Sequence, residues 1–285
     1  MRYAPISAAA VIFGALLALP LAGDTLYNNL TPNNQMAIAS RPDAPGAFEI
    51  ETGDDFLLNS QSTIKGASFV GLLVPTPGAR TAITGVTVEM YREFPKDSDS
   101  VRTSNVPTRA NSPSDVAFDF RDSASDLTFS DSVLAGAFTA LNSVQPGGIH
   151  PKPLQNTNGN GPLTGVELQF DVTFTTPFNL PADHYFFIPQ VAVTGGQFYW
   201  LSASRPISGA GTTPFAPDLQ VWTRDANLDP DWLRVGTDIV GGQTPPTFNA
   251  AFSLDGTAIP EPATIPLVVA GLALIGAKRF RSALS

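Results

Sequence analysis

Hydrophobic and polar residues alternate along several short segments of this chain. In residues 166–175, Val, Leu and Phe at even positions oppose Glu, Gln, Asp and Thr. A period of two is the side-chain spacing of a β-strand with one buried face. In residues 116–121 the same pattern places Val116, Phe118 and Phe120 on the buried face. Other segments with strand character are 67–74, 86–91, 127–129, 184–194, 197–202, 219–224 and 248–255.

Turn-forming residues separate these segments. Gly195-Gly196 lies between two strand segments and predicts a tight hairpin. The polar stretches 95–115 and 147–162 are expected to be surface loops, and residues 133–141 fit either a strand or a helical turn. Roughly ten short antiparallel strands predict an all-β fold, in the form of a single jelly-roll-like β-sandwich over residues 49–255.

The N-terminal residues resemble a secretory signal peptide in their layout. Arg2 is followed by an apolar run over residues 6–19, and small residues then precede Asp24. We therefore expect a signal helix within residues 1–23, with an N-terminal membrane anchor as the alternative. Residues 24–48 have no sustained period and are rich in Asn and Pro, which predicts an irregular lead-in.

Residues 256–285 form a linker and a tail in three parts. A proline-flanked glutamate comes first, an uncharged block at 263–277 comes next, and a basic cluster closes the tail. As a helix of about 1.5 Å per residue, the block reaches roughly 22 Å, short of the ~30 Å hydrocarbon core of a bilayer. We expect a short transmembrane helix with a cytoplasmic C-terminus. The flanking residues are Pro260, Glu261 and Pro262 on one side and Lys278, Arg279 and Arg281 on the other.

This tail resembles the PEP-CTERM sorting signal. The resemblance covers the tail alone, with its three parts in order near the C-terminus. It implies recognition of Pro260, Glu261 and Pro262 by exosortase, a membrane-embedded processing enzyme of exopolysaccharide-producing Gram-negative bacteria. The basic residues would orient the helix in the membrane. An ordinary C-terminal membrane anchor is the alternative.

Composition excludes several classes of function. The chain has no cysteine, so it has no disulfide, thiolate metal site or cysteine nucleophile. It has 16 Lys and Arg against 25 Asp and Glu; without the two ends 12 basic and 24 acidic residues remain, a net charge near −12. Such a surface repels phosphate backbones, which argues against nucleic acid as a partner.

Acidic residues after the strand at 219–224 form a candidate cation site. Their oxygen-bearing side chains recur at every second position, like the first half of a calcium loop. Pro230 stands where such a loop needs glycine, and Gly236 stands where it needs glutamate. We keep a calcium site and an ordinary turn of Asn, Asp and Pro as alternatives. The four residues are Asp225, Asn227, Asp229 and Asp231.

The sequence offers little for catalysis. His150 and His184 are the two histidines, and the motifs of serine hydrolases, zinc proteases and P-loop proteins are absent. Glu167 and Asp171 share a strand face and are the candidate pair for glycoside hydrolysis. We expect no enzymatic activity and no cofactor, with calcium as the one alternative.

The expected function is that of an exported, non-enzymatic surface or extracellular-matrix protein. It would be held briefly at the inner membrane and then displayed or released. The alternative is a carbohydrate-binding module that acts on exopolysaccharide through exposed aromatic residues. Trp200, Trp222 and Trp232 are the residues for that role, unless they fill the core.

Overall fold

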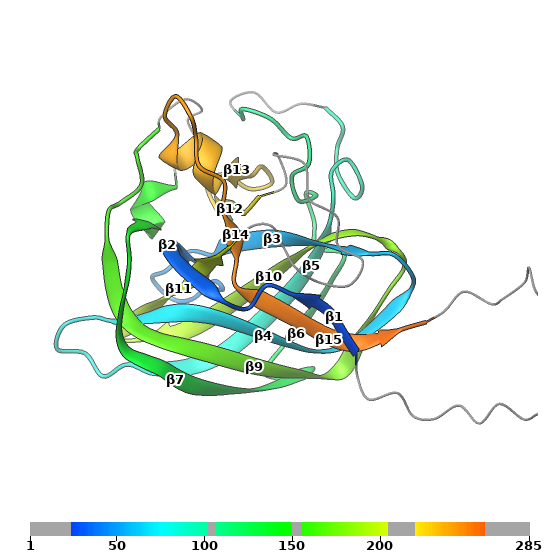
Figure 1. Ribbon diagram of the computed structural model, residues 1–285, viewed down its shortest axis with the longest axis horizontal. Coiled ribbons are helices and arrows are strands. Elements are labelled where there is room, and N and C mark those ends of the chain that lie inside the picture. Colours follow the sequence, from blue (N-terminus) through cyan, green and yellow to red (C-terminus); the bar gives the residue numbers. More distant parts are fainter. Residues whose placement is uncertain (1–23, 102–105, 150–155, 205–219, 260–285) are drawn as a thin grey trace, which may run out of the picture.

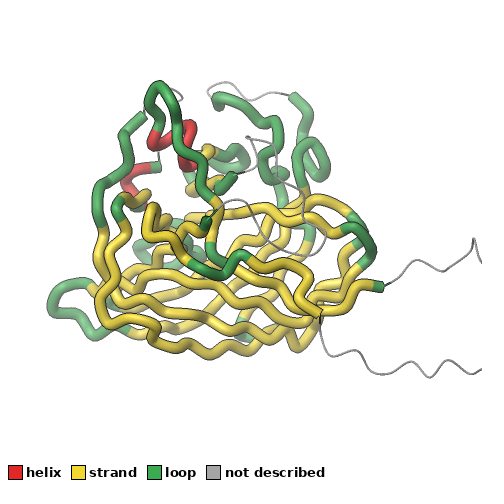
Figure 2. The backbone as a smooth tube through the Cα atoms, viewed as in Figure 1, coloured by secondary structure: helices red, strands yellow, loops and turns green. Residues whose placement is uncertain are grey.

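The computed structural model describes residues 24–101, 106–149, 156–204 and 220–259, and strands make up most of them (Figures 1 and 2). The predicted all-β class is confirmed. The expected signal peptide (residues 1–23), His150 and the tail from Pro260 onward lie outside the described residues. Within the described part, no helix has the length and apolar character needed to cross a membrane.

The larger of two sheets has nine strands and is antiparallel except where β2 runs parallel to β8. The long strand β4 lies at its centre and pairs with β9 on one side and with β15 and β11 on the other. Its strands are β1 (Asp24–Asn28), β2 (Pro32–Ala39), β4 (Ser62–Pro75), β7 (Leu127–Ala140), β8 (Asn142–Val144), β9 (Leu163–Leu180), β11 (Gly196–Ala203), β14 (Asn249–Ala250) and β15 (Phe252–Ala258).

The smaller sheet has six antiparallel strands, in the order β13-β12-β3-β10-β5-β6. They are β3 (Ile50–Leu58), β5 (Ala82–Arg92), β6 (Asp119–Asp122), β10 (Asp183–Thr194), β12 (Trp222–Asp225) and β13 (Leu233–Arg234). Two short helical turns complete the described elements, at Pro146–Gly148 and Val235–Val240.

Aromatic side chains from both sheets form one main core. Phe187 of β10 stacks on Phe252 of β15 with ring centroids 5.0 Å apart, and Phe69 of β4 lies 6.3 Å from Phe187. Phe56 of β3 meets Phe252 edge-on at 6.4 Å. Because each pair joins the two sheets, burial of these rings holds the sheets together.

The irregular lead-in predicted for residues 24–48 is wrong in its first part. β1 pairs with β15 and β2 pairs with β11, so the sheets begin at Asp24 and end at Ala258. The run Met36–Ala39 is buried at every position, which leaves no alternation to detect. Asn33 accepts a hydrogen bond from the Ser202 hydroxyl at 2.7 Å and donates to the Ala203 carbonyl at 2.8 Å, so this turn former serves the sheet.

The tight hairpin predicted at Gly195-Gly196 is also wrong. β10 belongs to the smaller sheet and β11 to the larger, so the chain crosses between sheets at this point. Gly195 has φ +64°, and a Cβ there would overlap the carbonyl oxygen of Arg80. Glycine is therefore favoured here because the backbone passes close to Arg80 as the chain crosses from one sheet to the other, and not because of a two-residue turn.

The strand face predicted in residues 116–121 is inverted. Val116, Phe118 and Phe120 are exposed, whereas Arg121 is buried. Arg121 lies over the Phe178 ring and donates to the carbonyls of Thr176 and Pro177, which belong to the other sheet. β6 is an edge strand, so its inward-facing side chains lie at the margin between the two sheets. A long side chain such as Arg121 fits there, because its apolar stem can be buried while its guanidinium binds polar groups.

Candidate functional site

A second, smaller hydrophobic cluster covers the face of the six-stranded sheet that points away from the main core. It consists of Tyr91, Phe186, Ile188, Trp222 and Trp232, and we call it the outer cluster. Gly53 of β3 lies beneath it, and a Cβ there would come within 2.8 Å of the Ile188 side chain. A bare backbone at this position lets side chains from neighbouring strands reach across β3.

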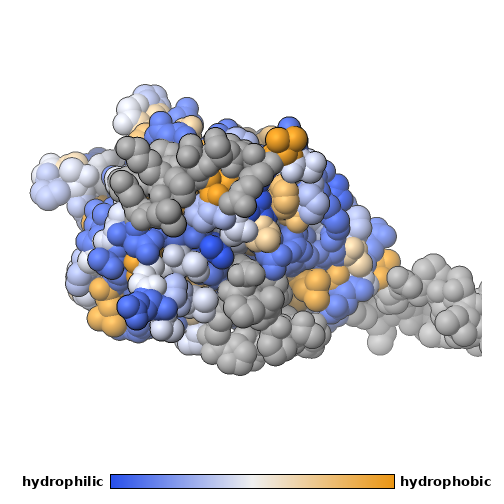
Figure 3. All heavy atoms as spheres, turned by 90° about the horizontal axis from the view of Figure 1, so that it is seen from above, coloured by the Kyte–Doolittle hydropathy of each residue, from blue (hydrophilic) through white to orange (hydrophobic). Residues whose placement is uncertain are grey.

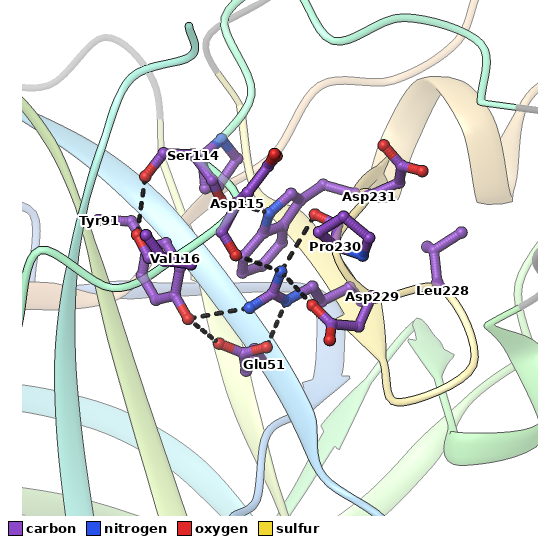
Figure 4. A network of polar contacts seen from close by, with 12 residues as sticks. Glu51, Tyr91, Ser114, Asp115, Val116, Leu228, Asp229, Pro230 and Asp231 are labelled. Atoms are coloured by element: carbon purple, nitrogen blue, oxygen red, sulfur yellow. Dashed lines mark hydrogen bonds and ion pairs between the residues drawn. The ribbon is translucent and has the colours of Figure 1, made fainter. Parts of the chain in front are cut away.

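Arg224 of β12 is the centre of a buried polar network beside this cluster (Figure 4). Its Nε donates to Glu51 of β3, and its Nη2 donates to the Tyr91 hydroxyl at 2.9 Å. Tyr91 in turn donates to Glu51 Oε1 at 2.6 Å. Burial alone would lower the pKa of Arg224, but the charge and hydrogen bond of Glu51 outweigh it and raise that pKa. Arg224 therefore stays charged.

The same guanidinium binds two loops to the sheet. Its Nη1 donates to the carbonyls of Asp115 at 3.2 Å and Pro230 at 3.0 Å, and it pairs with the Asp229 carboxylate at 2.8 Å. The Trp232 ring lies 4.4 Å from the guanidinium carbon. A planar fork with five donors suits this task, because it reaches several acceptors in one plane.

Arg109 links the two loops to each other. It is buried, pairs with Asp115 and Asp231, and stands over the Phe94 ring at 4.5 Å. Its distance to Asp231 is 3.4 Å. Arg109 and Arg224 together hold the described parts of two loops over the outer cluster, and we call these parts, residues 93–101, 106–118 and 225–232, the roof.

Glu89 of β5 is the most perturbed carboxyl group in this region. Burial and the nearby charge of Glu51 raise the pKa of Glu89 to about 9. A hydrogen bond with Glu51 acts in the same direction. Glu89 is therefore protonated at neutral pH, and one carboxyl is held neutral beside the Arg224–Glu51 pair.

His184 of β10 lies between two carboxylates on the same sheet face. Its Nδ1 is 2.7 Å from Glu93 Oε2, and its Nε2 is 2.9 Å from Asp55 Oδ2. Burial would lower the pKa of His184, but both hydrogen bonds and both charges oppose it and raise the pKa to about 9. The ring is thus an imidazolium at neutral pH and a cross-strand ion bridge.

The predicted calcium ligands are engaged elsewhere. Asp225 accepts the backbone N–H groups of Asn227 and Leu228 at 3.0 Å each, which is an Asx turn. Asp229 pairs with Arg224, and Asp231 pairs with Arg109. In the described part of the chain, no group of three or more His, Cys, Asp or Glu side chains is placed to hold a metal ion.

The three tryptophans do not form a carbohydrate platform, and that prediction is wrong for them. Trp200 and Trp222 are fully buried and Trp232 is 2% exposed. Trp200 belongs to the main core and donates to the Ala251 carbonyl at 2.9 Å, while Trp222 and Trp232 lie in the outer cluster. The period of a strand shows that an aromatic ring lies on one face or the other, but not whether that face is exposed. Here the main core covers one face and the roof covers the other, so rings on both faces are buried.

Glu167 and Asp171 do share one face of β9, as predicted. Glu167 is buried, and burial raises its pKa. Asp171 accepts hydrogen bonds from the Ser68 hydroxyl at 2.6 Å and from Gln169 at 2.9 Å. Four residues along a strand span about 13 Å, whereas the carboxyl pair of a glycosidase lies roughly 5–10 Å apart.

The sequence did not reveal Glu51, Glu89, Arg224 or the partners of His184. The signal was present as acidic residues four positions apart, a spacing that places both on one face of a strand. Glu51 and Asp55 lie in β3, and Glu89 lies in β5 with Glu93 just after it. Such a face is ordinarily interpreted as exposed to solvent. Here the roof covers it, and residues as far apart in the chain as Glu51 and Arg224 pair across the sheet.

Comparison with known proteins adds no identity. No family model, curated protein or solved structure matches this chain. The function therefore has to be argued from the residues and geometry of the chain itself.

Proposed function

We propose that this protein is an exported, non-enzymatic component of the cell surface or extracellular matrix, sorted by its C-terminal tail. An exosortase-like membrane enzyme would recognise Pro260, Glu261 and Pro262, and Lys278, Arg279 and Arg281 would hold the tail in the inner membrane until cleavage. In this proposal a signal helix precedes the body and a transmembrane helix at residues 263–277 comes after it. An exopolysaccharide matrix is the proposed destination.

The main support is the position of the folded body between the two signals. β1 begins at Asp24, the first residue after the proposed signal peptide, and β15 ends at Ala258, two residues before Pro260. Asp24 pairs with Gly256 across β1 and β15, so both junctions leave the sheet at the same place. Cleavage at either junction therefore removes no strand.

We further propose a jelly-roll-like β-sandwich for the body. Two sheets that share one aromatic core support this arrangement, as do the repeated crossings of the chain from one sheet to the other. The non-enzymatic part of the proposal draws on the candidate site, because Arg224, Arg109 and His184 each bind protein groups that join strands or loops.

Intact mass of the protein from its native host, or from a host with an exosortase, tests the sorting proposal. We expect an N-terminus near Asp24 and a C-terminus near Pro262. A host without the enzyme should accumulate a form that still carries the tail. Retention of Ser285 in both hosts would instead indicate a permanent anchor. A glycan array on the same mature protein tests the matrix role, since specific and saturable binding would favour a carbohydrate-binding module.

A further inference from the structure

β7 leaves one side of the larger sheet without a partner. It pairs with β9 along one edge, and no described strand pairs with its other edge. β7 has 14 residues, so it presents a long row of backbone N–H and C=O groups. Figure 1 shows it at the lower margin of the body. A free edge of this length is a template for a further strand.

The other edge strands in the described part are short or charged. β1 has five residues, β8 has three, and β13 and β14 have two each. β6 has four residues, three of which are Asp119, Arg121 and Asp122. Short and charged edges are the usual means of preventing edge-to-edge pairing. The molecule uses them at every described edge except β7.

The side chains of β7 also favour a partner. The strand has no Lys, Arg or Pro, and Asp131 is its single charge. Val133 is 62% exposed and Leu134 is 50% exposed. On the upper face of the molecule, away from β7, Figure 3 shows apolar residues only in separate small patches. An edge with a single charge in 14 residues, on a body of net charge near −12, is a surface at which two copies repel each other little.

We propose that the free edge of β7 pairs antiparallel with β7 of a second copy of this chain. An antiparallel edge is self-complementary about a two-fold axis, so one surface supplies both sides of the interface. Residues 127–133 form the regular part of the strand, because register shifts lie between Val133 and Ala135 and between Ala135 and Phe138. The interface is assigned to this seven-residue run.

An axis through Ser130 gives the most favourable register for this run. It places Leu127 opposite Val133 of the second copy and Asp131 opposite Phe129 of the second copy. The two carboxylates then do not face each other, and apolar side chains meet across the new pair. A one-residue slip would exchange the exposed and buried faces, so the register is specific.

A lysine on the edge tests this pairing. We compare Ser132→Lys on β7 with Thr173→Lys on β9, because both residues are exposed on the same sheet face but only the first is on the edge strand. Each variant is expressed from the full coding sequence, and the form of the protein that the host accumulates, processed or unprocessed, is purified and identified by its intact mass. Light scattering should show a dimer whose dissociation constant rises about tenfold or more in Ser132→Lys and stays unchanged in Thr173→Lys.

A cysteine at the axis gives a second readout. The chain has no native cysteine, so Ser130→Cys should form a disulfide-linked dimer under mild oxidation, and Ser125→Cys in the exposed turn before β7 should not. A protein that stays monomeric at all concentrations would overturn the proposal, since the free edge of β7 would then be available only to a strand of a different protein. A dimer that neither lysine weakens, or that both weaken equally, would overturn it as well.

Discussion

Several buried charges in the smaller sheet are neutralised by partners on neighbouring strands. Glu51 and Arg224 lie on neighbouring strands of the smaller sheet, and His184 joins β10 to Asp55 of β3 and Glu93 next to β5. Removing one member of such a set leaves the others buried without a counter-charge, which costs more than the intact set contributes. Single substitutions here should therefore have large and specific effects.

The first residue-scale prediction concerns the pH dependence of stability. The pKa of folded His184 is about 9, above the ordinary value of 6.5. Its stabilising contribution is therefore complete below pH ~6.5 and is lost as pH rises through 9. We expect the difference in unfolding free energy between wild type and His184→Gln to reach at most about 3 kcal/mol near pH 6 and to shrink strongly by pH 10. Urea unfolding at several pH values measures it.

Nuclear magnetic resonance provides the control for this prediction. The chain has two histidines, so His150→Gln assigns the remaining imidazole signal to His184. That signal should titrate near pH 9, and Glu93→Gln should lower the midpoint because one hydrogen-bonded carboxylate is lost. A midpoint near 6.5 in the wild type would contradict the ion bridge.

The second residue-scale prediction concerns the three buried tryptophans. Because all of them are buried, their fluorescence should be blue-shifted and nearly insensitive to iodide until the protein is unfolded. Oligosaccharides should leave the emission unchanged. Strong quenching of the native protein by iodide would show that at least one ring is exposed, and would restore the aromatic-platform hypothesis.

At the scale of elements, the alternation of hydrophobic and polar residues predicted those strands that have one buried and one exposed face. It did not predict strands that are buried on both faces, and it gave the wrong buried face for an edge strand. Leu168, Phe170, Val172 and Phe174 of β9 are buried as the alternation required. β2 escaped detection because its last four residues are buried on both faces. β6 was assigned the wrong face because an edge strand need not bury its apolar side. The roof could not be foreseen, since it depends on contacts between loops far apart in sequence.

The reassigned segment 24–39 gives an element-scale prediction. Ile38 of β2 is fully buried in the main core, so Ile38→Ala should destabilise the protein by about 2–5 kcal/mol. Truncation of the nearby exposed Gln35 to Ala is the control and should change stability by under about 0.5 kcal/mol. Equal, small effects of both substitutions in urea unfolding would restore the irregular lead-in.

A second element-scale prediction concerns attachment of the roof. Arg224→Lys keeps the charge but loses the planar fork, and we expect a loss of about 1–3 kcal/mol. Amide exchange should rise in residues 109–118 and 225–232, with little change in β3 and β10. Arg234→Lys is the matched control, because Arg234 pairs with Asp238 four residues along. Equal exchange in both variants would mean that Arg224 does not hold the roof.

At the scale of the whole molecule, the first and last strands of the described body pair with each other at one edge of the larger sheet. The register Asp24↔Gly256 to Asn28↔Ser253 joins the two ends of the described body. Each terminal strand thus supports the other, and β15 is also paired to β4. All of the described strand pairing therefore lies between Asp24 and Ala258.

This organisation predicts that the body is independent of both terminal segments. A chain of residues 24–259 should unfold cooperatively, with a midpoint temperature within about 2 °C of that of the full chain of residues 1–285, because every described strand pair is kept. Removal of six further residues, to give 24–253, should lower the midpoint by many degrees, since most of the β1–β15 and β4–β15 pairing disappears. Calorimetry of both chains measures the difference. A destabilised 24–259 chain would show that the terminal segments contribute to the stability of the body. In that case, cleavage of the tail would itself lower the stability of the exported protein.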